Sequence, residues 1–260
     1  MGVVCALALG REGSKGFPGK NLFPVLGRPL MAYPLLAARA AKSVARLYLS
    51  TDSKEMKAVG GDLGARIIDR PAELATDGAL GEEAFAHGYR VIREELRREG
   101  KEVELMVLLF CNAPTVTGVL IDDGVSALRL RPELDSAISC SVYNMWSPLR
   151  ARRLGPDGFL QPFVPFEVFG DPKTLNCDRN SQGDVWFADM GVSVVRPRNL
   201  ENLPEGILPQ RWMGKAIHPL KQWGGLDVDY EWQIPQVEHW LKSHGVKPAP
   251  TQEVTHAGKL

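Results

Sequence analysis

The sequence has no run of apolar residues long enough to span a membrane. Residues 3–9 are apolar, but a transmembrane helix needs about 20 such residues. No basic segment precedes this run, so it does not have the form of a secretory signal peptide. We therefore expect no association with a membrane.

Cysteine is scarce, and neither sign of charge dominates. The four cysteines, Cys5, Cys111, Cys140 and Cys177, are far apart and form no CxxC pair, which argues against a zinc or redox motif. Cys5 and Cys140 lie in apolar or strand-like runs, so we expect buried free thiols in a reducing, cytoplasmic compartment. Lys and Arg number 31, as do Asp and Glu. The net charge of zero argues against binding of nucleic acid through a broad basic surface.

The apolar pattern predicts an α/β protein. The chain has 260 residues, 44% of them hydrophobic, so it can bury a sizeable core. Predicted strands are residues 3–9, 46–52, 65–70, 103–110, 136–143 and 187–197. Predicted helices are residues 29–42, 53–60, 82–100 and 119–130. The stretch 224–245 predicts a last strand, an acidic turn and a helix. Such alternation favours a mainly parallel sheet with right-handed crossovers.

One region breaks this alternation. Residues 144–187 carry Pro, Gly, Asn and aromatic residues with little helical periodicity, so we expect loops and hairpins outside the sheet. Its phenylalanines could bury against a partner or pack on their own domain. They are Phe159, Phe163, Phe166 and Phe169. We treat residues 1–243 as one domain containing this insertion, and residues 244–260 as a loose C-terminal tail.

The glycine-rich loop GREGSKGFPGKN, residues 10–21, follows the first predicted strand. Its glycines let backbone N–H groups approach phosphate oxygens closely. Arg11, Lys15 and Lys20 add positive charge that suits phosphate. The loop has neither GxxxxGK[ST] nor GxGxxG, which disfavours a P-loop protein and a Rossmann oxidoreductase. From these residues alone, the loop is either a phosphate-binding site or a surface turn with solvated charges.

Four segments, in order, resemble the CMP-sialic acid synthetases, also called acylneuraminate cytidylyltransferases. GREGSKGFPGKN resembles their nucleotide-binding loop, which reads approximately ARGGSKGIPxKN. LSTDSKEM, RPAELATDGA and GLDVDYEW resemble their VSTDDEEI-like, RPAELAxDxA and DIDxPED-like segments. The resemblance extends from Val3 to about Leu241.

This resemblance implies both an activity and a fold. The family transfers CMP from CTP to the anomeric hydroxyl of a sialic-acid-like 2-keto sugar acid and releases pyrophosphate. The implied fold is a three-layer, Rossmann-like nucleotidyltransferase fold with a mostly parallel sheet. An inserted dimerisation element of the family corresponds to residues 144–187, so a homodimer is expected.

The resemblance also implies roles for individual residues. Lys20 matches a lysine near the α-phosphate and, with Arg11, is the expected catalytic residue. Arg70 matches an arginine beside the cytosine base, although it could also be an exposed arginine ahead of a proline. The other expected nucleotide-binding residues are Gly10, Gly13, Ser14, Lys15 and Asn21, of which Asn21 could instead cap a turn or a helix start. Asp52 either touches the nucleotide or caps the next helix. The expected sugar-binding residues are Asn112, Arg179 and Asp189.

Asp227 and Asp229 are the expected metal ligands. They lie two apart in LDVD, so on a strand their side chains face the same side. Carboxylates suit Mg²⁺, which would offset charge on the leaving pyrophosphate. Taken alone, the pair fits better as a strand end ahead of a helix N-terminus. The resemblance shifts the balance to a Mg²⁺ site.

The sequence departs from the family pattern on the sugar side. FCNAPTVT stands for the family's LLQPTSPLR, so Phe110 replaces a glutamine associated with the sugar, and no arginine follows Pro114 closely. Gly81 lies about where the family often has a serine near the base, and Asp189 replaces an asparagine. Since unpaired buried polar groups are costly, a changed site implies a changed sugar. We expect an acceptor other than plain N-acetylneuraminate, such as legionaminic, pseudaminic or another modified keto-sugar acid.

Two other functions stay open. One is a sugar-1-phosphate nucleotidyltransferase, with GTP as a candidate nucleotide. The other is a catalytically silent nucleotide-binding protein, against which Lys20, Asp227 and Asp229 argue. Products formed with different nucleotides and acceptors would distinguish them.

Overall fold

A seven-stranded sheet forms the centre of the molecule. The computed structural model describes residues 2–13, 15–178 and 183–249. The sheet has the order β11-β7-β10-β6-β1-β4-β5. Its strands are β1 (Gly2–Leu9), β4 (Arg46–Thr51), β5 (Arg66–Asp69), β6 (Glu102–Phe110), β7 (Ser136–Val142), β10 (Trp186–Val195) and β11 (Ile217–Gln222). β10 is antiparallel to β6 and β7, and the other pairs are parallel. The predicted, mostly parallel sheet is confirmed.

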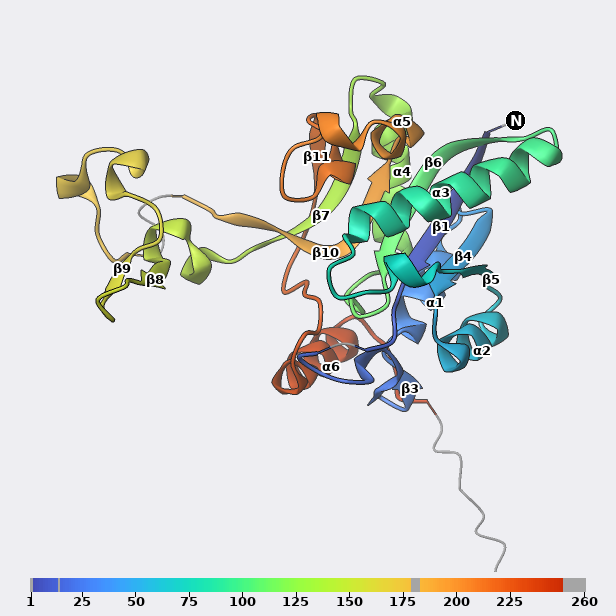
Figure 1. Ribbon diagram of the computed structural model, residues 1–260, viewed down its shortest axis with the longest axis horizontal. Coiled ribbons are helices and arrows are strands. Elements are labelled where there is room, and N and C mark those ends of the chain that lie inside the picture. The colour runs from blue at the N-terminus through green and yellow to red at the C-terminus, as the bar shows by residue number, and fades with distance from the viewer. Residues whose placement is uncertain (1, 14, 179–182, 250–260) are drawn as a thin grey trace, which may run out of the picture.

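Helices cover both faces of the sheet and give three layers (Figure 1). The helices of the described residues are α1 (Ala32–Ala40), α2 (Lys54–Asp62), α3 (Gly81–Arg98), α4 (Gly118–Leu130), α5 (Pro197–Glu201) and α6 (Ile234–Ser243), of which α6 lies beside the sheet. On one face, Leu35 of α1, Met56 of α2 and Ile121 of α4 share a buried core. On the other face, Phe85 of α3 and Leu200 of α5 share a second core. The predicted three-layer α/β fold is therefore confirmed.

The long helix α3 shows how the sequence produces these layers. Phe85, Tyr89, Ile92 and Leu96 recur every three or four residues, and all four are buried. This spacing places one apolar stripe on the sheet and leaves the charged residues on the solvent face. The helix predicted over residues 82–100 is confirmed.

Two predicted elements are corrected by the structure. The first helix begins at Ala32 rather than at residue 29, because Pro29 lies in the short strand β3 (Arg28–Pro29), which pairs with β2 (Pro24–Val25). Residues 224–229 do not form a strand; their backbone bonds to the loop after β6 instead, as in Val228 N–H to Asn112 O at 2.8 Å. The last strand is β11, a mixed polar and apolar strand that the pattern did not reveal.

A third buried core lies beside the sheet, at the end of the molecule away from the N-terminus (Figure 1). Val25 and Leu30, from the β2–β3 hairpin and its continuation, pack with Val228, Ile234 and Trp240. This core fastens helix α6 and the LDVD segment to the hairpin that follows the glycine-rich loop. It brings the two ends of the predicted site together.

The chain between β7 and β10 leaves the main sheet. It carries the short strands β8 (Arg152–Leu154) and β9 (Leu160–Pro162), which pair only with each other. Figure 1 shows this lobe set apart from the sheet at the end of two long connections. Several of its large apolar side chains are exposed, among them Phe159 at 71% and Leu160 at 73%.

The structure also bears on the predictions of buried free thiols and of no membrane-spanning segment. Cys5 and Cys140 are buried free thiols, as predicted, and Cys111 is a third. Cys177 is exposed. Among the described residues, none of the helices combines the length and apolarity needed to cross a membrane.

Candidate active site

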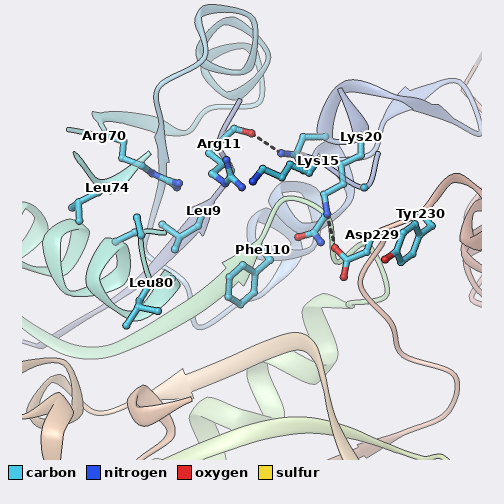
Figure 2. Close-up of a pocket in the computed structure, with 17 residues that line it drawn as sticks. Leu9, Arg11, Lys15, Lys20, Arg70, Leu74, Leu80, Phe110, Asp229 and Tyr230 are labelled. Carbon is cyan, nitrogen blue, oxygen red and sulfur yellow. Dashed lines mark hydrogen bonds and ion pairs between the residues drawn. The ribbon is translucent and has the colours of Figure 1, made fainter. Parts of the chain in front are cut away.

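A cavity of about 380 Å³ opens where strands β1 and β6 end. The loop after β1 forms one wall, and Phe110 and Asn112, at the end of β6 and just beyond it, line another part. The carboxyl ends of parallel strands are where α/β proteins usually bind ligands. Figure 2 shows Arg70 and Leu80 at one end of the cavity and Asp229 at the other.

The structure brings most of the predicted nucleotide-binding residues to this cavity. The predicted residues that line it are Gly10, Arg11, Lys15, Lys20, Asn21 and Arg70. Gly13 lines a neighbouring cavity of about 370 Å³ that shares part of the loop. Ser14 lies outside the described residues.

Two loop cations share one carboxylate. Arg11 Nη2 lies 2.9 Å from Asp77 Oδ1, and Lys15 Nζ lies 2.6 Å from Asp77 Oδ2. Hydrogen bonds from Lys15 and then Arg11 hold the pKa of Asp77 below its usual range. Asp77 thus occupies the place between two cations that an anionic group of a ligand could take. Sequence reasoning did not single out Asp77, although it lies in the RPAELATD segment.

Lys20 connects the glycine-rich loop to the LDVD segment near the C-terminal helix. Its side chain is largely buried, and Nζ donates to Val228 O at 2.6 Å and to Asp229 Oδ1 at 2.7 Å. A buried ammonium needs such partners, because burial of an unpaired charge is costly. The contact fixes a positive charge at the Asp229 end of the cavity.

Asp227 and Asp229 lie close together but differ in exposure. Asp229 lines the cavity and Asp227 does not. Burial, and next the charge of Asp229, raise the pKa of Asp227. Asn112 Nδ2 lies 3.4 Å from Asp227 Oδ2 and donates to Val228 O at 3.0 Å, so it steadies this segment. A cation bound beside Asp227 would offset the negative charge of Asp229, which disfavours the ionised form of Asp227. No cluster of three or more acidic, His or Cys groups suited to a metal occurs within the described ranges.

Asn21 presents an unused acceptor in the cavity wall. Its Nδ2 donates to Arg11 O at 3.3 Å. Its Oδ1 is buried and has no hydrogen-bond partner among the residues that the structure describes. Because an unsatisfied buried acceptor is costly, a donor on a bound ligand would stabilise it.

Arg70 is a buried cation at the opposite end of the cavity. Nη2 donates to Ser50 O at 2.7 Å, and burial lowers the pKa of the guanidinium. It forms no ion pair with any described residue. Leu80 and Gly81 line the cavity at the same end, and a Cβ at Gly81 would meet only Phe110, at 3.7 Å. The alternative of an exposed arginine is wrong, since Arg70 is only 9% exposed.

Phe110 makes part of the cavity apolar. Its ring contacts Phe85 edge to face with the ring centroids 5.1 Å apart, and Trp212 lies 6.1 Å away. This aromatic cluster fixes Phe110 in place, since edge-to-face pairs are favourable beyond their buried area. A polar ligand group would find no hydrogen-bonding side chain at that position.

The other predicted residues lie elsewhere. Asp189 is 5% exposed, does not line the cavity, and accepts hydrogen bonds from Ser139 Oγ, Ser141 Oγ and Gln222 Nε2. Asp52 Oδ1 accepts from the backbone N–H of Glu12. Arg179 lies outside the described residues.

A glycine-rich, cation-bearing loop at the carboxyl edge of a three-layer α/β sheet is an arrangement suited to binding an anionic group such as a phosphate. Residues 5–87 match a family model described as cytidylyltransferase. The resemblance predicted from the sequence is therefore confirmed.

Curated relatives have related names. The chain is 34% identical over 88 residues to the N-acylneuraminate cytidylyltransferase of Escherichia coli O18:K1:H7, a match covering 34% of this chain and 21% of that protein. It is 26% identical over 130 residues to the 8-amino-3,8-dideoxy-manno-octulosonate cytidylyltransferase of Shewanella baltica, covering 50% of this chain and 49% of that protein. The chain thus spans from a fifth to about half the length of these relatives.

Solved structures share the fold. A CMP:2-keto-3-deoxy-manno-octonic acid synthetase complexed with CTP superposes with a TM-score of 0.66 at 18% identity, covering 93% of this chain and 99% of that one. A 4-diphosphocytidyl-2C-methyl-D-erythritol synthase from Anaerococcus prevotii gives a TM-score of 0.59 at 11% identity, covering 93% and 96%. These similarities show that the chain shares the overall fold of these proteins.

Proposed function

We propose that this protein transfers CMP from CTP to the anomeric hydroxyl of a sialic-acid-like 2-keto sugar acid. The hydroxyl oxygen bonds to the α-phosphorus and loses its proton, while the bond from that phosphorus to the bridging oxygen breaks and pyrophosphate leaves. The observation that carries this proposal is one cavity with Arg70 at one end, loop cations in the middle, and Lys20 with Asp229 at the other end.

The triphosphate would lie along the loop. Arg11 and Lys15 already hold an anionic group, the Asp77 carboxylate, at 2.9 and 2.6 Å. Phosphate oxygens can replace a carboxylate between two cations, because charge-assisted hydrogen bonds suit both anions. Binding of the nucleotide would therefore release Asp77.

The base would lie at the Arg70 end. Arg70 is buried without an ion pair among the described residues, so an uncharged carbonyl or ring nitrogen could accept from it. Asn21 Oδ1 would accept from a donor on the nucleotide. Arg70 offers hydrogen-bond donors and Asn21 Oδ1 offers an acceptor, and a cytosine nucleotide carries groups that can pair with both.

Lys20 would stabilise negative charge that develops at the α-phosphate. Transfer of this kind depends on positioning and charge neutralisation rather than on covalent participation by the protein. Asp227 and Asp229 would hold Mg²⁺, which supplies charge neutralisation to the phosphates when bound. Lys20 and Asp229 therefore mark the reacting end of the cavity.

The sugar would be a modified keto-sugar acid. Phe110 gives the cavity an apolar wall that accepts no hydrogen bond. Asn112, which also lines the cavity, remains the candidate sugar contact. The relatives include a Helicobacter pylori protein named pseudaminic acid cytidylyltransferase and UDP-2,4-diacetamido-2,4,6-trideoxy-beta-L-altropyranose hydrolase. It is 27% identical over 147 residues, or 56% of this chain and 27% of that protein. A sugar-1-phosphate nucleotidyltransferase is less well supported, because the curated relatives bear the names of cytidylyltransferases for keto-sugar acids.

The quaternary structure and compartment belong to the same proposal. The exposed apolar side chains of the β8–β9 lobe would be buried in a homodimer. The buried free thiols of Cys5, Cys111 and Cys140 support a reducing compartment such as the cytoplasm.

A nucleotide screen tests the proposal. CTP, GTP, UTP and ATP are offered with N-acetylneuraminate, pseudaminic acid, 8-amino-3,8-dideoxy-manno-octulosonate and hexose 1-phosphates, and pyrophosphate release is measured. We expect release with CTP and a keto-sugar acid. Turnover with a hexose 1-phosphate alone would contradict the proposal.

A further inference from the structure

Tyr230 stands at the reacting end of the cavity and has no assigned role. It lines the cavity next to Asp229, yet 53% of the residue is exposed. Figure 2 shows its ring beside the Asp229 carboxylate, at the end away from Arg70. A large aromatic ring left open at a polar site is a candidate for contact with a ligand.

The backbone that carries Tyr230 is fixed. Gln233 Oε1 accepts from the N–H of Asp229 at 2.7 Å and from the N–H of Tyr230 at 2.8 Å. Gln233 Nε2 donates to Asp227 O at 3.2 Å. The Gln233 side chain thus holds the backbone of Asp227, Asp229 and Tyr230 in a single turn. The backbone that carries the Tyr230 ring is therefore held in place.

The glycine-rich loop approaches this turn closely. A Cβ at Gly16 would lie 2.7 Å from Asp229 O and 3.4 Å from Tyr230 Cε1. Only glycine allows such an approach, so the loop and the Tyr230 ring form adjoining walls. The Trp232 ring lies nearly parallel to the Tyr230 ring, with 6.3 Å between the centroids and 12° between the planes. Trp232 is itself 63% exposed.

We infer that Tyr230, backed by Trp232, is the wall on which the acceptor sugar ring rests; the inference builds on the function proposed above. The base end of the cavity is distant, and the leaving pyrophosphate is an anion that gains little from an aromatic face. A pyranose ring presents C–H bonds on one face, and an aromatic ring provides a large, rigid apolar surface for it. Because Tyr230 follows Asp229 directly, an acceptor resting on it reaches the phosphorus near Lys20.

The test compares Tyr230→Ala with Tyr230→Phe in the full chain. Steady-state rates are measured with CTP saturating and the acceptor varied, using the keto-sugar acid that wild type turns over fastest among N-acetylneuraminate, pseudaminic acid and 8-amino-3,8-dideoxy-manno-octulosonate. Tyr230→Ala should raise the KM for the acceptor about tenfold, which corresponds to the loss of one stacking contact. Tyr230→Phe keeps the ring and should stay within about twofold of wild type. The dissociation constant for CTP, measured by calorimetry without acceptor, should be unchanged in both.

Trp223→Ala is the matched control, because Trp223 is 52% exposed but does not line the cavity. It should leave the acceptor KM unchanged. An active wild type whose Tyr230→Ala variant keeps the acceptor KM, or weakens CTP instead, overturns the inference alone. A wild type that releases no pyrophosphate with any of these acceptors contradicts the proposed function, and the inference with it.

Discussion

Lys20 is the residue on which the proposed chemistry depends most. It is buried against Val228 O and Asp229, so its ammonium is already placed at the reacting end of the cavity. Lys20→Ala should lower kcat about 10²–10³-fold, as removal of one preorganised donor typically does. Pyrophosphate release under saturating CTP and acceptor measures this.

Lys57→Ala is the control for that variant. Lys57 pairs with Asp69 on the surface of α2 and β5, away from the cavity. Its loss should leave kcat unchanged. Equal activity of Lys20→Ala and wild type, with both folded by circular dichroism, would remove Lys20 from the proposed chemistry.

Among individual site residues, those that lie within one continuous motif could be predicted from the sequence. Arg11, Lys15 and Lys20 share a loop whose composition already suggests phosphate. The partners of these cations were harder to find, because Asp229 lies 209 positions from Lys20. Asp77 and Tyr230 lie within the family-like segments RPAELATDGA and GLDVDYEW, but they were not singled out because their contacts with the loop are set by the folded chain.

The glycine-rich loop is the element that holds the cavity together. Gly16→Ala places a Cβ 2.7 Å from the backbone oxygen of Asp229, which cannot swing aside as a side chain could. We expect destabilisation of about 1–3 kcal/mol and a loss of pyrophosphate release. Urea denaturation followed by fluorescence measures the first effect.

Gly61→Ala is the counterpart in helix α2. A Cβ there meets nothing within 4 Å. Since alanine is the better helix former, this variant should be neutral or about 0.5–1 kcal/mol more stable. Gly16→Ala with the stability and activity of wild type would show that the loop does not press on the Asp229 turn.

Ion pairs of Arg46 connect strand β4 to helix α3 and to the residue that follows it. Arg46 binds Glu99, just past the end of α3, and also Glu95. Hydrogen bonds from Arg46, and next from Lys101, lower the pKa of Glu99 from 4.5 to about 2. Because the folded state favours the ionised form of Glu99, this contact contributes its full stabilisation of the folded state above pH 4.5. That contribution is lost as the pH falls towards 2.

Glu99→Gln tests this linkage. The difference in urea midpoint between wild type and variant should be largest above pH 4.5 and vanish near pH 2. Glu102→Gln is the control, since Glu102 is exposed and forms no ion pair with any described residue. A difference that stays constant with pH would contradict the assignment.

The elements of the fold were largely predictable, with informative exceptions. Strands such as β6 are continuous apolar runs, and helices such as α3 have a clear apolar stripe, so periodicity identifies them. β11 was missed because it is an edge strand with exposed polar residues and Pro219, and edge strands lack the buried signature. The strand predicted at the start of residues 224–245 does not form, because extended backbone shows the same alternation whether or not it joins a sheet.

At the scale of the whole molecule, the β8–β9 lobe bears on assembly. Phe159 and Leu160 are more than two-thirds exposed on a lobe apart from the main core. If they bury against a second copy, light scattering should give twice the 28.6 kDa of one chain. The double variant Phe159→Asp and Leu160→Asp should shift the mass to that of a monomer, because charges are costly in an apolar interface. A wild type that stays monomeric at every concentration would contradict the dimer.

Product analysis tests the central claim most directly. The purified chain is incubated with CTP, Mg²⁺ and a 2-keto sugar acid, and both pyrophosphate and the sugar product are quantified by mass spectrometry. We predict equal amounts of pyrophosphate and a CMP-sugar in which the anomeric oxygen is bonded to phosphorus. An NDP-sugar formed only from a sugar 1-phosphate, or nucleotide binding without any product, would contradict the account.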